Sequence, residues 1–143
     1  MNLYRSLHDV SFERETVLTV GTFDGVHRAH QDILQTLQQR AQLYKRRNFV
    51  ITFDPHPRTV IEKNSSLKAL TTLDERIALF HQFNVENLLI LRFTKEFSEL
   101  SFREFYKEYI ITTIGVAEVV EGYNHHFGKG REGNGSTLLE LGN

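Results

Sequence analysis

The sequence predicts an α/β fold in which a parallel sheet is covered by helices on both faces. Short apolar runs rich in β-branched residues recur along the chain, and segments with helical periodicity separate them. Clusters of glycine, proline and histidine follow three of these runs. Strands that alternate with helices are typical of parallel sheets with right-handed crossovers. The expected strands are residues 17–20, 49–53, 88–91 and 117–120.

The first strand and the helix after it have the clearest pattern. Residues 17–20 form an apolar run bounded by glycine, which indicates a buried strand. Gly21 and Gly25 bracket the next turn, where glycine accepts backbone angles that other residues resist. From His27 onward the pattern is helical, and apolar residues recur at spacings of three and four. This stripe consists of Ile33, Leu34, Leu37 and Ala41.

Shorter signals predict the remaining elements. Two prolines in Asp54–Pro57 stop the strand at 49–53. Capping-box spacing at Thr72–Glu75 and at Ser101–Glu104 predicts that helices start there, and Gly115 ends the second. We expect residues 1–15 to be a polar lead-in, 45–47 a solvated helix end, 93–100 an irregular segment with two exposed aromatics, 122–135 a glycine-rich loop and 138–141 the start of a further helix.

Composition limits the classes of function. With 143 residues, 40% of them apolar and 24% charged, the chain is one domain or slightly less. A net charge of −1 does not favour nucleic-acid binding. The absence of cysteine excludes disulfides and thiolate metal sites and fits a cytoplasmic protein. The sequence has neither a signal-peptide pattern at its start nor an apolar run long enough to span a membrane.

The expected topology brings three polar clusters to one edge of the sheet. Gly21–His30, Asp54–Pro57 and Gly122–Arg131 each follow a predicted strand, and ligands of such sheets sit at the carboxyl ends of the strands. His27 and His30 share one face at the start of a helix, where unpaired amides and the helix dipole favour an anion. This arrangement suits phosphate, although an ordinary strand-to-helix turn with two surface histidines has the same spacing.

Two of these clusters resemble signatures of a known family. Gly21–His30 resembles the His-x-Gly-His signature of the nucleotidylyltransferase superfamily, with Ala29 in place of the glycine. Its Phe-Asp-Gly-Val-His form is similar to the FMN adenylyltransferase (FAD synthetase) domain of bacterial bifunctional riboflavin kinase/FAD synthetases. Residues 53–57, Phe-Asp-Pro-His-Pro, match the second signature of that family. The resemblance implies a Rossmann-like nucleotidylyltransferase fold.

The third cluster matches the family with two departures. The family has Gly-x-Asp-Phe-x-Phe-Gly-x-x-x-x-Gly here, and Asn124 replaces the aspartate while His125 replaces the first aromatic. A later Ser-Ser-Thr-x-Ile-Arg-like signature and a C-terminal riboflavin kinase domain, normally fused in this family, do not follow within the sequence. We therefore expect residues 1–143 to be a partial FMN adenylyltransferase domain, incomplete at its C-terminus. The matching residues of the cluster are Gly122, Phe127, Gly128 and Gly133.

The resemblance implies that the chain transfers AMP from ATP to FMN, giving FAD and pyrophosphate, as a step of FAD biosynthesis from riboflavin. His27 and His30 would be catalytic, contacting the ATP phosphates, and Mg²⁺ is expected with ATP, although no carboxylate cluster identifies its ligands. The expected ATP-binding residues are Gly21, Thr22, Phe23, Asp24, Gly25, His27, His30, Asp54, His56, Asn124, Gly128 and Arg131.

Three alternatives remain open from the residues alone. A non-catalytic nucleotide- or flavin-binding fragment fits the departures at Ala29 and Asn124. A nucleotidylyltransferase with another phosphate acceptor, such as nicotinate mononucleotide, also fits the first motif. A zinc site is the third alternative, because imidazole suits zinc. Its ligands would come from His27, His30, His56, His125 and His126.

Overall fold

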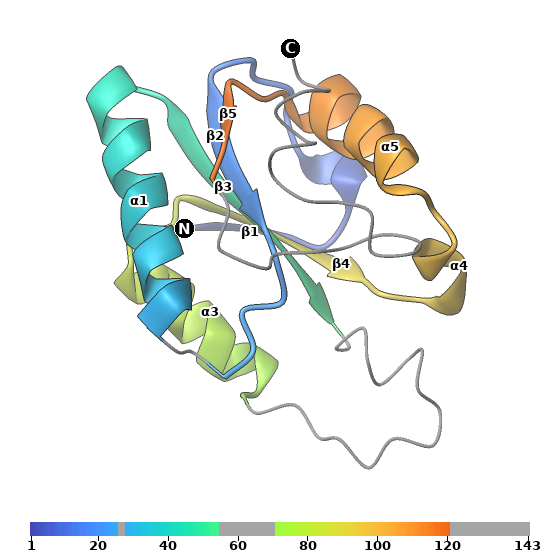
Figure 1. Cartoon of the computed structure of the whole chain (residues 1–143), viewed down its shortest axis with the longest axis horizontal. Coiled ribbons are helices and arrows are strands. Elements are labelled where there is room, and N and C mark those ends of the chain that lie inside the picture. Colours follow the sequence, from blue (N-terminus) through green and yellow to red (C-terminus); the bar gives the residue numbers. More distant parts are fainter. Residues whose placement is uncertain (26–27, 55–70, 121–143) are drawn as a thin grey trace.

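A parallel sheet flanked by helices forms the centre of the molecule (Figure 1). The computed structural model describes residues 1–25, 28–54 and 71–120. Within them the sheet has five strands in the order β1-β4-β3-β2-β5, and every neighbouring pair is parallel. The predicted fold class is confirmed. The strands are β1 (Asn2–Tyr4), β2 (Thr16–Val20), β3 (Arg47–Asp54), β4 (Asn87–Arg92) and β5 (Glu118–Val119).

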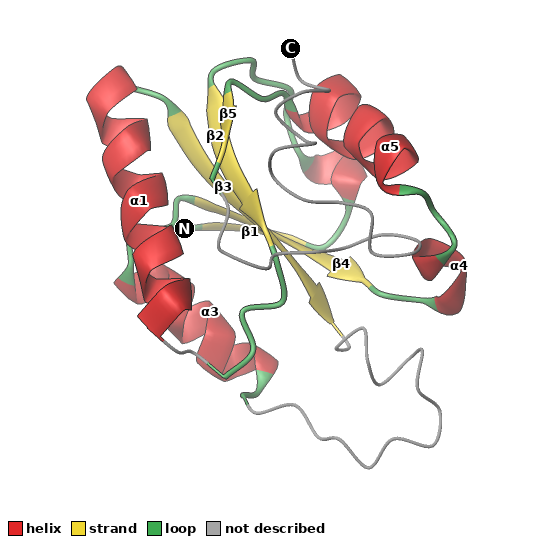
Figure 2. Ribbon diagram, viewed as in Figure 1, coloured by secondary structure: helices red, strands yellow, loops and turns green. Residues whose placement is uncertain are grey.

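Helices cover both faces of the sheet (Figure 2). One face carries α1 (Arg28–Tyr44) and α3 (Leu73–Gln82). The other carries α4 (Lys95–Ser98) and α5 (Phe102–Phe105), which continues as a π-helix over Tyr106–Ile114. A short 3₁₀ helix spans Leu7–Asp9. In the part of the chain that the structure describes, no helix has the length and apolar character to span a membrane.

Alternation along the strands divides the core into two clusters. In β2, Val17 packs beneath α1, while Leu18 and Val20 pack beneath the π-helix. In β3, Val50 faces the α1 side and its neighbours Phe49 and Ile51 face the other side. Because both faces are buried, the strands read as continuous apolar runs, which is why the sequence pattern identified them.

The winding of the sheet reverses beside β2. The chain passes from β2 to β3 and then to β4 in one direction, and it returns to add β5 on the opposite side of β2. In open α/β sheets, ligands bind outside the carboxyl ends of the strands at such a reversal. Helix α1 begins at this same end of β2 (Figure 1).

The N-terminal segment is not a lead-in, and that prediction was wrong. Asn2–Tyr4 forms the edge strand β1 and pairs in parallel with Asn87–Leu89 of β4. Val10 is also buried in the core. A strand of three residues is too short to show a recognisable pattern. Its pairing partner also lies 85 residues away along the chain, so no local signal indicates the pairing.

The basic segment at 45–47 also differs from the prediction. Helix α1 ends at Tyr44, and Lys45 takes a positive φ of 54°. Arg47 is already the first residue of β3, and only 9% of its side chain is exposed. The basic run therefore includes a strand residue whose side chain is largely covered, so it is not simply a solvated helix end.

The aromatic segment at 93–100 packs against the core, contrary to the prediction. It contains α4, whose N-cap Thr94 accepts a hydrogen bond from the Phe97 amide. The rings of Phe93 and Phe97 each lie 5.7 Å, between centroids, from the ring of Phe53. Both side chains are half-buried, because the end of β3 offers them an aromatic partner that the local sequence does not reveal.

The predicted helix ends are confirmed. Thr72 and Glu75 form a capping box at the start of α3, and Ser101 and Glu104 exchange the equivalent pair of bonds before α5. Gly115 ends the π-helix with a φ of 91°. The π-helical winding itself is not encoded by any pattern that we recognised. The predicted loop at 122–135 and the helix at 138–141 lie outside the described residues.

An ion pair fastens β5 to helix α1. The Arg40 guanidinium donates two hydrogen bonds of 2.7 Å to the Glu118 carboxylate. These bonds hold the pKa of Glu118 below its ordinary value of 4.5. A carboxyl with a lowered pKa contributes stability that is present above its unfolded pKa and is lost as the pH falls.

We therefore expect Glu118→Gln to lower the melting temperature at pH 7 and to do so progressively less as the pH falls below about 4.5. Thermal unfolding of both proteins between pH 3 and pH 7 measures this difference. The exposed Glu99→Gln serves as the control. A difference that stays constant across the range would show that the charge of Glu118 does not contribute.

Candidate functional site

The turn after β2 is anchored by a buried phenylalanine. The Gly21 amide continues the sheet by donating to the Ile51 carbonyl at 3.0 Å. Phe23 is 2% exposed, and its ring packs edge-on against Phe80 of α3, with a centroid separation of 5.2 Å. The ring of His30, in the first turn of α1, lies 5.3 Å from Phe23. The turn, α1 and α3 therefore share one packing centre.

The backbone of this turn takes unusual angles. Gly25 has a φ of 85°, in agreement with the role predicted for glycine here. Phe23 has a φ of 55°, which is uncommon for a bulky residue and stores backbone strain. Strain of this kind clusters at functional sites, where surrounding contacts hold the chain in place. No local pattern predicts that Phe23, rather than a glycine, takes such an angle.

Asp24 ties the turn to the start of α3. Its Oδ1 accepts hydrogen bonds from the Thr71 amide at 2.8 Å and from the Thr71 hydroxyl at 2.9 Å. The Gly25 amide donates to the same hydroxyl at 3.3 Å. Asp24 is half-buried. Part of its carboxylate therefore shapes the turn.

Asp54 and Arg76 meet at the end of β3. The Asp54 side chain is 43% exposed, and its Oδ1 lies 3.6 Å from Nη2 of Arg76. Arg76 is buried, and its Nη1 donates to the Thr22 carbonyl at 2.9 Å, the Thr52 hydroxyl at 3.1 Å and the Phe53 carbonyl at 3.0 Å. Burial lowers the pKa of Arg76, and the charge of Asp54 opposes that shift.

Sequence reasoning missed Arg76, although a signal was present. Leu73, Arg76 and Phe80 recur at helical spacing on the side of α3 that faces the sheet. A charged residue within an apolar stripe is rarely buried without a specific set of partners. An arginine in the apolar stripe of a helix that packs near the carboxyl ends of the strands is therefore a candidate functional residue.

The structure brings together the described part of the predicted site. Thr22 and Asp54 converge on Arg76, Asp24 belongs to the same turn as Thr22, and His30 is joined to that turn through Phe23. The other predicted site residues lie outside the described residues: His27, His56, Asn124, Gly128 and Arg131.

The described residues do not form a metal cage. Among residues 1–25, 28–54 and 71–120, no group of three or more histidine, aspartate or glutamate side chains could hold an ion. Four of the five histidines of the zinc hypothesis fall outside these ranges, and His30 is the fifth. The zinc alternative thus stays untested by the geometry.

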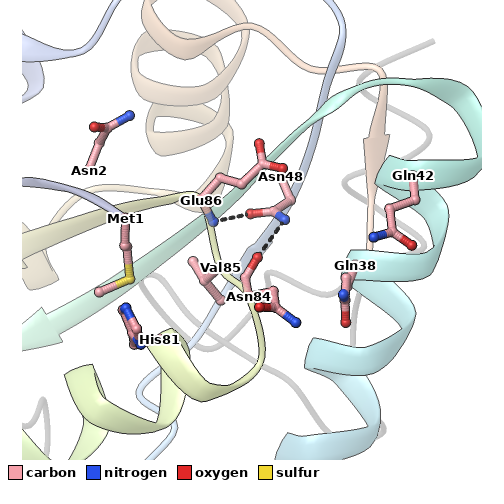
Figure 3. A pocket seen from close by; sticks show the side chains of 9 residues that line it. All are labelled: Met1, Asn2, Gln38, Gln42, Asn48, His81, Asn84, Val85 and Glu86. Atoms are coloured by element: carbon pink, nitrogen blue, oxygen red, sulfur yellow. Dashed lines mark hydrogen bonds between the residues drawn. The ribbon is translucent and has the colours of Figure 1, made fainter.

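A cavity of about 720 Å³ lies beside the amino ends of the strands, at the end of the sheet opposite to the turn at residues 21–25 (Figure 3). Asn48, near the start of β3, closes one side, because its amide group donates to the Asn84 carbonyl at 3.0 Å and accepts from the Glu86 amide at 2.6 Å. This cavity borders the amino ends of strands, so it is separate from the predicted motifs. It is lined by Met1, Asn2, Gln38, Gln42, Asn48, His81, Asn84, Val85 and Glu86.

Comparisons with known proteins agree with the motifs. The family model described as FAD synthetase matches residues 9–143. Proteins named bifunctional riboflavin kinase/FMN adenylyltransferase are similar to the chain. The protein from Escherichia coli K12 is 31% identical over 144 residues, which cover 99% of this chain and 46% of that protein. The one from Listeria monocytogenes is 35% identical over 125 residues, covering 87% of this chain and 40% of that protein.

A solved structure supports the fold. A crystal structure described as a macrolide-efflux protein from Streptococcus pneumoniae superposes with a TM-score of 0.78 at 22% identity, covering 99% of this chain and 46% of that one. The chain spans about half the length of the curated relatives it matches. Because the family model covers nearly the whole chain and the motif turn lies where the sheet reverses, the chain belongs to the FAD synthetase family.

Proposed function

We propose that this chain is an FMN adenylyltransferase domain, which transfers AMP from ATP to FMN and releases pyrophosphate. The observation that carries the proposal is the family match over residues 9–143, combined with the position of the Gly21–His30 motif where the sheet winding reverses. The curated relatives bear the name of this activity together with that of riboflavin kinase. We also propose that the chain is normally fused to a riboflavin kinase domain and acts in the cytoplasm.

In this reaction a phosphate oxygen of FMN forms a bond to the α-phosphorus of ATP, and the bond from that phosphorus to the pyrophosphate oxygen breaks. No protein nucleophile is needed, so catalysis consists of positioning the two substrates and stabilising charge on the phosphate oxygens. We assign that stabilisation to His27 and His30, with the amides of the first turn of α1. The turn at residues 21–25 would let its backbone approach the phosphates closely.

We propose that Mg²⁺ arrives with ATP. The described carboxylates do not fit a protein cage, because Asp24 Oδ1 is occupied by Thr71 and Asp54 lies beside the Arg76 guanidinium. Mg²⁺ is commonly held by substrate phosphates and water together with one or two carboxylates. The ion would neutralise part of the triphosphate charge.

FAD formation is the direct test. We expect the chain mixed with FMN, ATP and Mg²⁺ to form FAD and pyrophosphate in equal amounts. Chromatography measures the FAD, and a coupled assay measures the pyrophosphate. Riboflavin in place of FMN should give no FAD, because it lacks the attacking phosphate. Nicotinate mononucleotide in place of FMN tests the alternative acceptor. Binding of ATP without product would instead favour the non-catalytic fragment.

A further inference from the structure

Arg76 joins the turn at residues 21–25 to the end of β3 through one buried guanidinium. Its Nη1 donates to the Thr22 carbonyl after β2 and to the Phe53 carbonyl at the end of β3. It also donates to the Thr52 hydroxyl, which in turn donates to the Thr22 carbonyl at 3.2 Å. The backbones that carry the first and second motifs are thus held together by a side chain from α3.

Stability alone does not account for this arrangement. Only 4% of Arg76 is exposed, and burying a charge costs free energy that well-packed apolar side chains do not incur. The fit is also incomplete, because among the described residues Nε finds no hydrogen-bond partner. A buried cation with incomplete satisfaction is a poor way to fill a core, which points to a role at the adjoining site.

The charge of Arg76 faces the carboxylates of the site. Asp54 Oδ1 lies 3.6 Å from Nη2 and its side chain is 43% exposed, so the carboxylate is open to solvent at the carboxyl end of β3. Asp24 is in the neighbouring turn and also acts electrostatically on Arg76. Without a cation, these two negative charges would repel an approaching triphosphate.

We propose that Arg76 is a positioning residue for the adenylyl transfer proposed above, on which this inference rests. It sets the separation between the turn at residues 21–25 and the end of β3, and it offsets the negative charge of Asp54 so that ATP can approach. It acts through these groups and contacts no reacting atom. Its loss should therefore raise the KM for ATP more than the loss of a comparable buried arginine that lies away from these turns.

The chain contains a matched control at the other end of the sheet. Arg47 is also a largely buried arginine, and it donates to the Thr16 hydroxyl at 3.1 Å and to the carbonyls of Ser11 at 3.0 Å and Ile114 at 2.9 Å. Its partner carboxylate, Glu13, lies 3.6 Å away. Removing Arg47 therefore removes the same kinds of bonds far from the motif turns.

The experiment compares Arg76→Met, Arg76→Lys and Arg47→Met in the full chain. The first readout is amide hydrogen exchange without substrate, in peptides covering residues 20–25 and 51–54. We expect Arg76→Met to speed exchange in both segments by about 10-fold and to raise the KM for ATP by about 10- to 100-fold. Arg76→Lys keeps the positive charge, so its KM for ATP should lie between those of the parent and Arg76→Met. Its amide exchange in the two segments should stay as fast as in Arg76→Met.

Arg47→Met should lower the melting temperature about as much as Arg76→Met does. It should leave amide exchange in residues 20–25 and 51–54, and the KM for ATP, within about 2-fold of the parent. The proposal is overturned if Arg76→Met leaves exchange at both segments unchanged, or if Arg47→Met raises the KM for ATP equally. A parent chain that forms no FAD would count against the proposed function. Exchange would still decide whether Arg76 positions the two turns.

Discussion

Replacing His30 with alanine is expected to lower the rate of FAD formation by about 100- to 1000-fold, the usual effect of removing a donor that stabilises transition-state charge. His30 lies in the first turn of α1, beside the turn that carries the first motif. Its loss should reduce kcat and kcat/KM together, because the contact would strengthen as charge develops on the phosphate oxygens. Steady-state assays with varied ATP measure both constants.

The histidine at position 81 provides the control. His81 is exposed at the end of α3 and borders the cavity beside the amino ends of the strands. His81→Ala should retain the parent rate. Thermal unfolding of His30→Ala separates lost chemistry from lost structure, since truncating the half-buried ring also removes its contact with Phe23. Full activity in a folded His30→Ala protein would exclude the proposed role.

The second large effect is on stability, at Gly115. Its φ of 91° is strained for any residue with a side chain. An added Cβ would also collide with the Glu13 carbonyl, which accepts a hydrogen bond from the Thr16 hydroxyl at 2.7 Å. We expect Gly115→Ala to destabilise the protein by about 3 kcal/mol or more, equivalent to a fall in melting temperature of roughly 10 °C.

Denaturant or thermal unfolding followed by circular dichroism measures this loss. Lys107→Ala, an exposed change in the same π-helix, should stay within about 0.5 kcal/mol of the parent. A Gly115→Ala protein with parental stability would mean that the backbone near Glu13 is free to shift. The cost would then be smaller than the contact implies.

Local patterns carried most of the prediction of the fold. The three strands β2, β3 and β4 are buried on both faces, so their apolar runs stand out in the sequence. The Thr72 and Ser101 capping boxes and Gly115 depend on residues within a few positions of each other, and they were predicted for that reason. The same holds for the first motif, whose residues follow one another along the chain.

Errors arose where partners are distant in the sequence. Tyr4 belongs to a strand because β4 pairs with it, and Phe97 is half-buried because rings from β3 and α5, those of Phe53 and Phe105 among them, pack against it. Arg47 begins a strand instead of ending a helix, because the chain turns at Lys45. None of these outcomes leaves a periodic signal that could be read locally.

Short-range spacing was therefore enough to predict the class of the fold, the central strands, the capping boxes before α3 and α5, and the turn at residues 21–25. The strand order, the strained angle of Phe23 and the burial of Arg76 against Thr22 and Asp54 became visible only in the folded structure. These features require residues from separate elements to meet. The free energy of such contacts depends on packing and desolvation, which no local pattern records.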